Sequence, residues 1–298
     1  MSDQEYLEAI LADQTLEEGG EELKALRAHR KDVEDLLRAK FGLGGPSIRY
    51  GGSYKKGTMN RDSYDLDMTC YFGREDTVAG TTLKEIYENV EEALREKYWT
   101  ERKGSAIRLR SLDDLRSDFH IDVVPGRFVE GKEGDVHLYR SNGDKAYLKT
   151  NLDVHIDHVQ GSGAVPAIRL MKLWSVRRYV EVKTFVLELL AIKLLEGRSK
   201  QALASQLQHV LTQFRDHSDS LAIVDPANAN NDLGELLNEA VRFNLQSAAE
   251  ATLRSVEENG WEAIFGPAEK KEKAAALSRL AVAAVVRPKP YHPGDDVV

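Results

Sequence analysis

The hydrophobic pattern of the chain changes near Asn151, and this change limits the folds that the sequence can adopt. Before it, short stretches rich in β-branched and aromatic residues are separated by turn residues, which is typical of β-strands. We expect strands at 47–50, 64–72, 105–110, 118–124 and 127–140, and one helix near 82–98. After it, apolar residues recur at spacings of three and four, which predicts a bundle of helices. The sequence therefore predicts an α+β protein with a mixed β-sheet lobe and an α-helical lobe.

A helical pattern also precedes the strands. After Gly19 and Gly20, apolar residues recur with charged residues between them until residue 41. These apolar residues are Leu23, Leu26, Val33, Leu36, Leu37 and Phe41. A chain of 298 residues exceeds the usual size of one domain. We expect two units, residues 1–160 with the N-terminal helix and residues 161–298.

Composition narrows the class of protein. The single cysteine, Cys70, excludes an intrachain disulfide and a cysteine-rich zinc site, and it fits a reducing compartment. No basic segment followed by an apolar stretch opens the chain, and no apolar run approaches the roughly 18 residues of a membrane span. We expect a cytoplasmic protein. The formal net charge of -8 argues against binding along a nucleic-acid backbone, which needs many Lys and Arg contacts, but a small triphosphate needs only a few.

Two aspartates separated by one residue, Asp65 and Asp67, lie in the strand-like stretch SYDLDMTCYF. Side chains two residues apart leave the same face of a strand, so these carboxylates would lie close enough to share a cation. Mg²⁺ prefers oxygen ligands, although a solvated strand face is the simpler interpretation of the pair alone. The turn Gly51, Gly52 and Ser53 upstream favours a phosphate site, because glycines let backbone N–H groups approach an anion and serine adds a hydroxyl.

A third carboxylate follows in the stretch SDFHIDVVPGR. Alternation places Phe119, Ile121 and Val123 on one face of a strand and His120 and Asp122 on the other. Asp122 is therefore the expected third metal ligand and a candidate base. Three carboxylates suit phosphoryl transfer with two metal ions.

These motifs resemble those of the nucleotidyltransferase superfamily: GGSYKKGT, then DLD, then HIDVVP. In the helical half, RLMKLWS and VKTFVLELLAIKLL resemble the lysine-bearing and glutamate-bearing helices of the cGAS/DncV-like nucleotidyltransferases of bacterial anti-phage defence. The resemblance covers residues 45 to 240. It implies a two-lobed fold bridged by a long N-terminal helix. It also implies synthesis of a cyclic di- or trinucleotide from ATP and other nucleoside triphosphates, with two Mg²⁺ ions (or Mn²⁺) and release of pyrophosphate.

The resemblance assigns roles by position. Asp65, Asp67 and Asp122 would bind both metal ions and carry catalysis, and Gly52 and Ser53 would hold the donor triphosphate. The same motifs contain further nucleotide-binding candidates: Lys56, Lys172, Ser175 and Thr184.

Each of the further candidates also has a simpler interpretation. Lys56 lies in a predicted loop, where lysines are commonly only solvated. Lys172 would reach the outer phosphates from the helical lobe, or would extend along an amphipathic helix toward water. Ser175, after Trp174, is a candidate base contact, and Thr184 stands where the family often has serine.

Two other groups of polar residues have no assigned chemistry. The arginines and lysine of the segment 102–110, Arg102, Lys103, Arg108 and Arg110, would steer nucleotides or form a solvated strand edge. The stretch NLDVHIDHV contains His155 among other metal-ligand types, and surface polar residues on a helix explain it better than a metal site.

Three alternatives to a cyclic oligonucleotide synthase stay open. The first is a template-independent enzyme that acts on RNA, which should have a more basic surface. The second is a transferase that modifies a small molecule or a protein. The third is a catalytically inactive nucleotide-binding module, which the three clustered carboxylates disfavour. We expect no nucleic-acid activator, no membrane association, a regulatory protein partner and an effector that binds the product.

Overall fold

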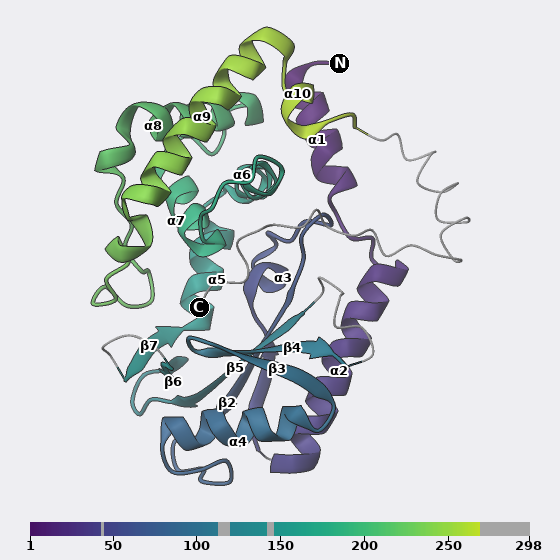
Figure 1. Ribbon diagram of the computed structural model, residues 1–298, viewed down its shortest axis with the longest axis vertical. Coiled ribbons are helices and arrows are strands. Elements are labelled where there is room, and N and C mark those ends of the chain that lie inside the picture. The colour runs from purple at the N-terminus through teal and green to yellow at the C-terminus, as the bar shows by residue number, and fades with distance from the viewer. Residues whose placement is uncertain (43–44, 113–119, 142–145, 269–298) are drawn as a thin grey trace.

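The computed structural model describes residues 1–42, 45–112, 120–141 and 146–268, which form two lobes (Figure 1). The sheet lobe contains β1 (Ser47–Tyr50), α3 (Gly52–Lys56), β2 (Leu66–Phe72), α4 (Leu83–Arg95), β3 (Tyr98–Lys103), β4 (Ala106–Ser111), β5 (Ile121–Phe128), β6 (Asp135–Tyr139) and β7 (Tyr147–Asn151). The helical lobe contains α5 (Leu152–Gly161), α6 (Val165–Arg177), α7 (Thr184–Leu194), α8 (Leu203–His217), α9 (Glu239–Asn259) and α10 (Glu262–Phe265). The α+β class and the two-lobed architecture predicted from the sequence are confirmed.

The sheet is mixed, with the order β1-β2-β5-β4-β3 and with β6 and β7 continuing from β5. Strands β2 and β5 run parallel, and the other pairs are antiparallel. The predicted strand at 127–140 is wrong, because Gly131 and Gly134 take positive φ angles of 70° and 76° in the turn that separates β5 from β6. Strand β3 was missed, since its polar sequence YWTERK hides the pattern. The predicted strand residues 118 and 119 lie outside the described residues.

Alternation in the central strands gives the sheet one apolar and one polar face. Met68, Ile107 and Val123 belong to one buried core, which the first long helix of this lobe, α2 (Glu21–Phe41), and α4 cover (Figure 1). Cys70 is fully buried in the same core and serves as a small apolar residue. The opposite face carries the intervening residues, among them Asp122. This polar face therefore faces away from α2 and α4.

The N-terminal bridge between the lobes consists of two helices rather than one. The first, α1 (Asp3–Asp13), buries Tyr6 and Leu7 in the core of the helical lobe, whereas α2 packs in the sheet lobe. The chain between them includes Gly19 with φ 84° and Gly20, which precedes α2. Glycine destabilises a helix when it lies in the interior, so the predicted N-terminal helix is interrupted at this point. The expected division at residues 160 and 161 stays a prediction, and the structure places α1 with the helical lobe.

The helical lobe packs around α6 and α7, whose apolar residues are almost all buried. Trp174 of α6 is 1% exposed, and its indole N–H donates to the hydroxyl of Thr252 on α9 at 2.8 Å. Two short 3₁₀ turns, Ser218–Ser220 and Gly234–Leu237, connect α8 to α9. Among the described residues, no helix has both the length and the apolar character to cross a membrane.

A buried polar group joins the lobes, and we call it the interlobe cluster: Lys56, Thr58, Lys172 and Glu188. The Glu188 carboxylate accepts from the Lys56 ammonium at 2.7 Å and from the Thr58 hydroxyl at 2.8 Å. Lys172 donates to the Thr58 carbonyl at 2.8 Å and lies 3.8 Å from a Glu188 oxygen. Glu188 is 1% exposed and Thr58 is fully buried. The cluster therefore joins α3 and the residues just after it to both α6 and α7.

We expect Glu188→Gln to lower the free energy of unfolding by about 3 kcal/mol, because two buried ammonium groups would lose their carboxylate partner. Urea denaturation followed by circular dichroism measures the difference. The matched control is Glu196→Gln, an exposed position just after α7, where the same change should alter stability by less than about 0.5 kcal/mol. A Glu188→Gln protein as stable as the native chain would show that the cluster does not stabilise the fold.

Candidate active site

The glycine turn after β1 rests directly on one of the predicted metal ligands. The Gly51 N–H donates to the Asp67 carbonyl at 2.9 Å, and Gly52 begins α3 with φ 51°. A Cβ atom at Gly52 would lie 1.5 Å from Asp67 Oδ2. Only glycine therefore fits between the turn and the carboxylate. Ser53 follows in α3, so the structure brings the predicted phosphate turn and Asp67 together.

The predicted carboxylates come from adjacent strands. Asp67 on β2 is the register partner of Asp122 on β5, and neighbouring strands lie about 4.8 Å apart. Asp65 stands one residue before β2, with a side chain 48% exposed. Its carboxylate lies 3.1 Å from His120 Nδ1, and the other ring nitrogen lies 3.9 Å from Asp122. The structure therefore gathers all three aspartates at the start of β2 and β5.

Burial and neighbouring charges raise the pKa of Asp67 to about 6, from an ordinary value of 3.8. Burial is the largest cause, and the negative charges of Asp122 and Asp65 add to it, whereas Lys56 and Lys172 oppose it. A carboxylate in this environment favours a cation or a proton beside it. A bound cation or proton would therefore stabilise this site.

Oxygen-only ligands with excess negative charge fit Mg²⁺ or Mn²⁺, and the backbone of the glycine turn lies next to the Asp67 carboxylate. Within the described ranges, no three His, Cys, Asp or Glu side chains already converge on one point as metal ligands. The side chains turn elsewhere: Asp122 binds Arg108 through two hydrogen bonds of 2.9 Å, and Asp65 lies against His120. To bind a metal ion, Asp65 would have to turn, and Asp122 would share its carboxylate with Arg108.

Neither predicted lysine is a solvated surface residue. Lys56 is 11% exposed, and Lys172 is 7% exposed, so the expectations of a solvated loop lysine and of a lysine extended toward water are wrong. Both belong to the interlobe cluster, because the lobes close over these positions. Burial lowers the pKa of Lys172, and the neighbouring Glu188 charge opposes that shift. Lys56 and Gly52 also line a cavity between the turn and the helical lobe, which we call the main cavity.

The remaining predicted contacts are less closely connected to the carboxylates. The Ser175 hydroxyl donates to the carbonyl of Lys172 in its own helix at 2.8 Å. Thr184 is exposed at the first position of α7, while its neighbours Lys183 and Phe185 line the main cavity. Among the described residues, no hydrogen bond or ion pair connects Ser175 or Thr184 to the turn or to the aspartates, so their roles stay predictions.

The main cavity has a volume of 720 Å³ and extends from Gly52 and Lys56 toward the helical lobe. This volume is in the usual range for small-molecule sites. His155 in its wall contacts Thr150 at 3.1 Å and Asp225 at 3.4 Å, and its side chain is 13% exposed. The expectation that His155 is a surface residue is therefore wrong, because the segment after α8 folds over α5.

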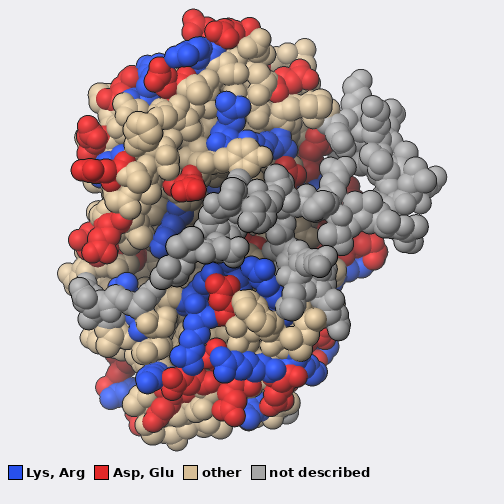
Figure 2. Space-filling view, in the orientation of Figure 1, with Lys and Arg blue, Asp and Glu red and all other residues tan. Residues whose placement is uncertain are grey.

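Basic side chains gather on the front of the sheet lobe, where β3 and β4 lie in the same view (Figure 2). Several are paired with carboxylates: Arg102 with Glu91 and Arg108 with Asp122. Arg110 instead lies over the Trp99 ring at 5.8 Å. The segment is therefore neither a simple solvated edge nor a row of free cations.

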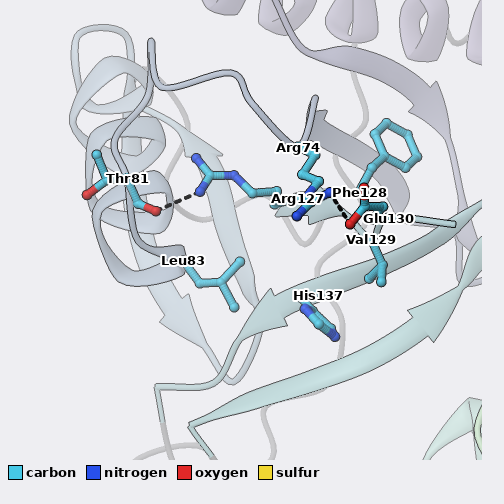
Figure 3. Close-up of a pocket in the computed structure, with 8 residues that line it drawn as sticks. All are labelled: Arg74, Thr81, Leu83, Arg127, Phe128, Val129, Glu130 and His137. Carbon is cyan, nitrogen blue, oxygen red and sulfur yellow. Dashed lines mark hydrogen bonds and ion pairs between the residues drawn. The ribbon is translucent and has the colours of Figure 1, made fainter.

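A second cavity of 420 Å³ lies at the other end of β5 (Figure 3). Its Arg127 is five residues beyond Asp122, which is roughly 16 Å along a strand. The guanidinium of Arg127 donates to the carbonyls of Thr81, Asp76 and Gly80 at 2.6 to 2.8 Å. Because these contacts fix the loop before α4, the cavity has a structural explanation and is separate from the aspartates.

The fold matches those of solved nucleotidyltransferases. Escherichia coli MS115-1 CdnC with ATP superimposes at a TM-score of 0.67 and 17% identity, over 90% of this chain and 99% of that chain. CdnG, a CD-NTase of Bradyrhizobium diazoefficiens in complex with GTP, gives 0.66 and 14%, over 93% and 99%. Vibrio cholerae DncV, a cyclic AMP-GMP synthase and prokaryotic cGAS homolog, gives 0.62 and 14%, over 81% and 76%.

The same CdnC has been solved in a complex with HORMA-deltaN. No protein-family model and no curated protein matches the sequence. At these identities the likeness establishes the fold, so the fold implied by the sequence resemblance is confirmed.

We expect Gly52→Ala to destabilise the protein more than Gly57→Ala, although both positions have positive φ angles, 51° and 75°. At Gly57 a Cβ meets nothing within 4 Å, so only backbone strain of about 1–2 kcal/mol arises. At Gly52 the added atom must also displace the Asp67 carboxylate. Urea denaturation compares the two variants, and equal losses of stability would contradict the close contact.

We expect Asp67→Asn to stabilise the metal-free protein at pH 8 by at most about 3 kcal/mol and to have little effect near pH 4. Folding raises the pKa of Asp67 to about 6. The protonated side chain therefore contributes to the stability of the folded protein below pH 4, and this contribution is lost as the pH rises through 6. Asparagine removes that loss because it stays neutral. Thermal unfolding across pH 4 to 8 tests this, with the exposed Asp157→Asn as control; a benefit independent of pH would contradict it.

Proposed function

We propose that this chain, which has the fold of the CD-NTases, is a Mg²⁺-dependent nucleotidyltransferase that makes a cyclic di- or trinucleotide from nucleoside triphosphates and releases pyrophosphate. One observation carries the proposal: the glycine turn rests on Asp67 Oδ2 while Asp67 and Asp122 lie in register on parallel strands. This arrangement brings the backbone of the glycine turn next to paired carboxylates, which supports a site for a phosphate and a metal ion. The fold supports the proposal, because this chain shares it with CdnC, which was solved with ATP, and with the cyclic AMP-GMP synthase DncV.

The proposed roles follow from position. Asp65, Asp67 and Asp122 would hold two Mg²⁺ ions, which would activate the attacking hydroxyl and neutralise the leaving pyrophosphate. Gly52 and Ser53 would bind the donor phosphates through backbone N–H groups and a hydroxyl.

Lysines and polar residues of the cleft complete the proposed nucleotide site. Lys56, at the mouth of the main cavity, would add a positive charge, and Lys172 would contribute from the interlobe cluster. Ser175 and Thr184 remain proposed nucleotide contacts, although the described contacts do not connect them to the turn.

We propose ATP as a substrate, together with other nucleoside triphosphates, since CdnC was solved with ATP and CdnG with GTP. The net charge of -8 supports small substrates and no nucleic-acid activator. The CdnC complex with HORMA-deltaN supports a regulatory protein partner. The product would signal to an effector in cytoplasmic anti-phage defence. The second candidate, transfer of a nucleotide to RNA, a small molecule or a protein, shares the same carboxylates.

We expect the full chain, incubated with Mg²⁺ and labelled ATP, GTP, CTP and UTP singly and together, to release pyrophosphate and form a phosphatase-resistant product. Thin-layer separation and mass spectrometry identify the product. Asp65→Asn with Asp67→Asn should abolish formation of this product, because both metal ligands lose their charge.

The control for folding is the thermal stability of the double variant, which should equal or exceed that of the native chain. Pyrophosphate release without a phosphatase-resistant product would favour transfer to another acceptor. Unchanged activity of the double variant would contradict the assignment of the carboxylates.

A further inference from the structure

Arg108 continues the row of aspartates across the sheet. Asp67 on β2, Asp122 on β5 and Arg108 on β4 are successive register partners, so the three side chains leave the same face of neighbouring strands. The guanidinium of Arg108 donates through Nε to one oxygen of Asp122 and through Nη2 to the other, each at 2.9 Å. The Arg108 and Asp122 side chains are only 24% and 17% exposed.

This paired contact fixes the Asp122 carboxylate in one plane. Two parallel N–H···O bonds from a planar guanidinium define both the position and the rotation of a carboxylate, which a single bond does not. Each oxygen of Asp122 retains a lone pair for a further ligand. The geometry thus leaves Asp122 able to bind a metal ion while its orientation is set by Arg108.

The contact also balances charge in the crowded site. Asp65, Asp67 and Asp122 bring three carboxylates together, and Arg108 places one fixed positive charge against the last of them. A role in holding the sheet is a weaker explanation, because β4 and β5 already pair through their backbones over Ile107 to Leu109. A direct role in holding phosphate is also weaker, since the fork of the guanidinium is occupied.

We propose that Arg108 is a positioning residue: it holds Asp122 in the orientation used for catalysis and stands in for a cation until a divalent ion binds. The proposal rests on the function proposed above for the three aspartates. It makes two separable claims, one about the charge of Arg108 and one about its forked geometry. Arginine and lysine share the first property and differ in the second.

The charge claim is tested without nucleotide by titrating the full chain with Mn²⁺ and measuring free ion by electron paramagnetic resonance. We expect Arg108→Gln to bind Mn²⁺ about tenfold more tightly than the native chain, because a positive charge next to the ion is gone. Arg108→Lys keeps that charge, so its Mn²⁺ affinity should stay within about twofold of the native value.

The geometry claim is tested by kinetics at saturating Mg²⁺. Both Arg108→Gln and Arg108→Lys should lower kcat by about 10- to 100-fold, since neither side chain orients both oxygens of Asp122, while the KM for ATP stays within about threefold. A residue needed only for folding would instead lower thermal stability and leave Mn²⁺ affinity unchanged.

The matched control is Arg110→Gln, on the same strand two residues away, where the side chain contacts Trp99 instead. It should leave Mn²⁺ affinity within about twofold of the native value. Equal tightening in Arg110→Gln and Arg108→Gln would overturn the specific role, as would native Mn²⁺ affinity in Arg108→Gln or native kcat in Arg108→Lys. If Arg108→Gln does not fold, Arg108→Lys still decides the geometry claim. If the native chain transfers no nucleotide, the proposed function fails, whereas the Mn²⁺ titration still tests the charge of Arg108.

Discussion

The buried carboxylate of Glu188 is the contact on which the relation between the lobes depends. It accepts from Lys56 and Thr58 of the sheet lobe and lies beside Lys172 of α6. Buried ions are costly unless they are paired and hydrogen-bonded, so these partners have little freedom to separate. The helix α3, which carries Ser53, is therefore held against α6 and α7, and Phe185 of α7 lines the main cavity. The position of the glycine turn relative to the helical lobe follows from this contact.

The sheet lobe contains a repulsive interaction, in contrast to the attractive ion pairs of the interlobe cluster. Its row of side chains brings like charges together, and burial, together with the charges of Asp122 and Asp65, raises the pKa of Asp67. Gly52 lets the turn approach the same carboxylate without a clash, and Arg108 offsets charge at the far end of the row. Clustered charges of this kind are typical of functional sites, because a protein selected for stability alone would separate them. The contact of Gly52 with Asp67 and the pairing of Arg108 with Asp122 both depend on strand register. A slip by one residue would turn the charged side chains to the apolar face of the sheet.

Much of the fold could be predicted because it follows from local periodicity. The alternation around Ile121 places Asp122 opposite the apolar core, as expected, and the change of pattern at Asn151 marks the start of the helical lobe. The break of the N-terminal helix was missed, although Gly19 and Gly20 stood at the position where it occurs. Strand β3 was missed because an edge strand with polar residues on both faces lacks the alternation that identifies a strand.

The sequence by itself indicated the change from strands to helices near Asn151, the apolar face of the sheet and the three candidate aspartates, because these depend on neighbours within a few residues. Only the tertiary structure decided which charges meet. Lys56 and Glu188 are 132 residues apart, and no local pattern indicates that a lysine in a short helix will become buried against α7. Likewise, Arg108 and Asp122 bind only because β4 and β5 pair in one register. A charged side chain acquires its role from the partner that folding brings to it, since burial and Coulomb energy depend on distance in space rather than along the chain.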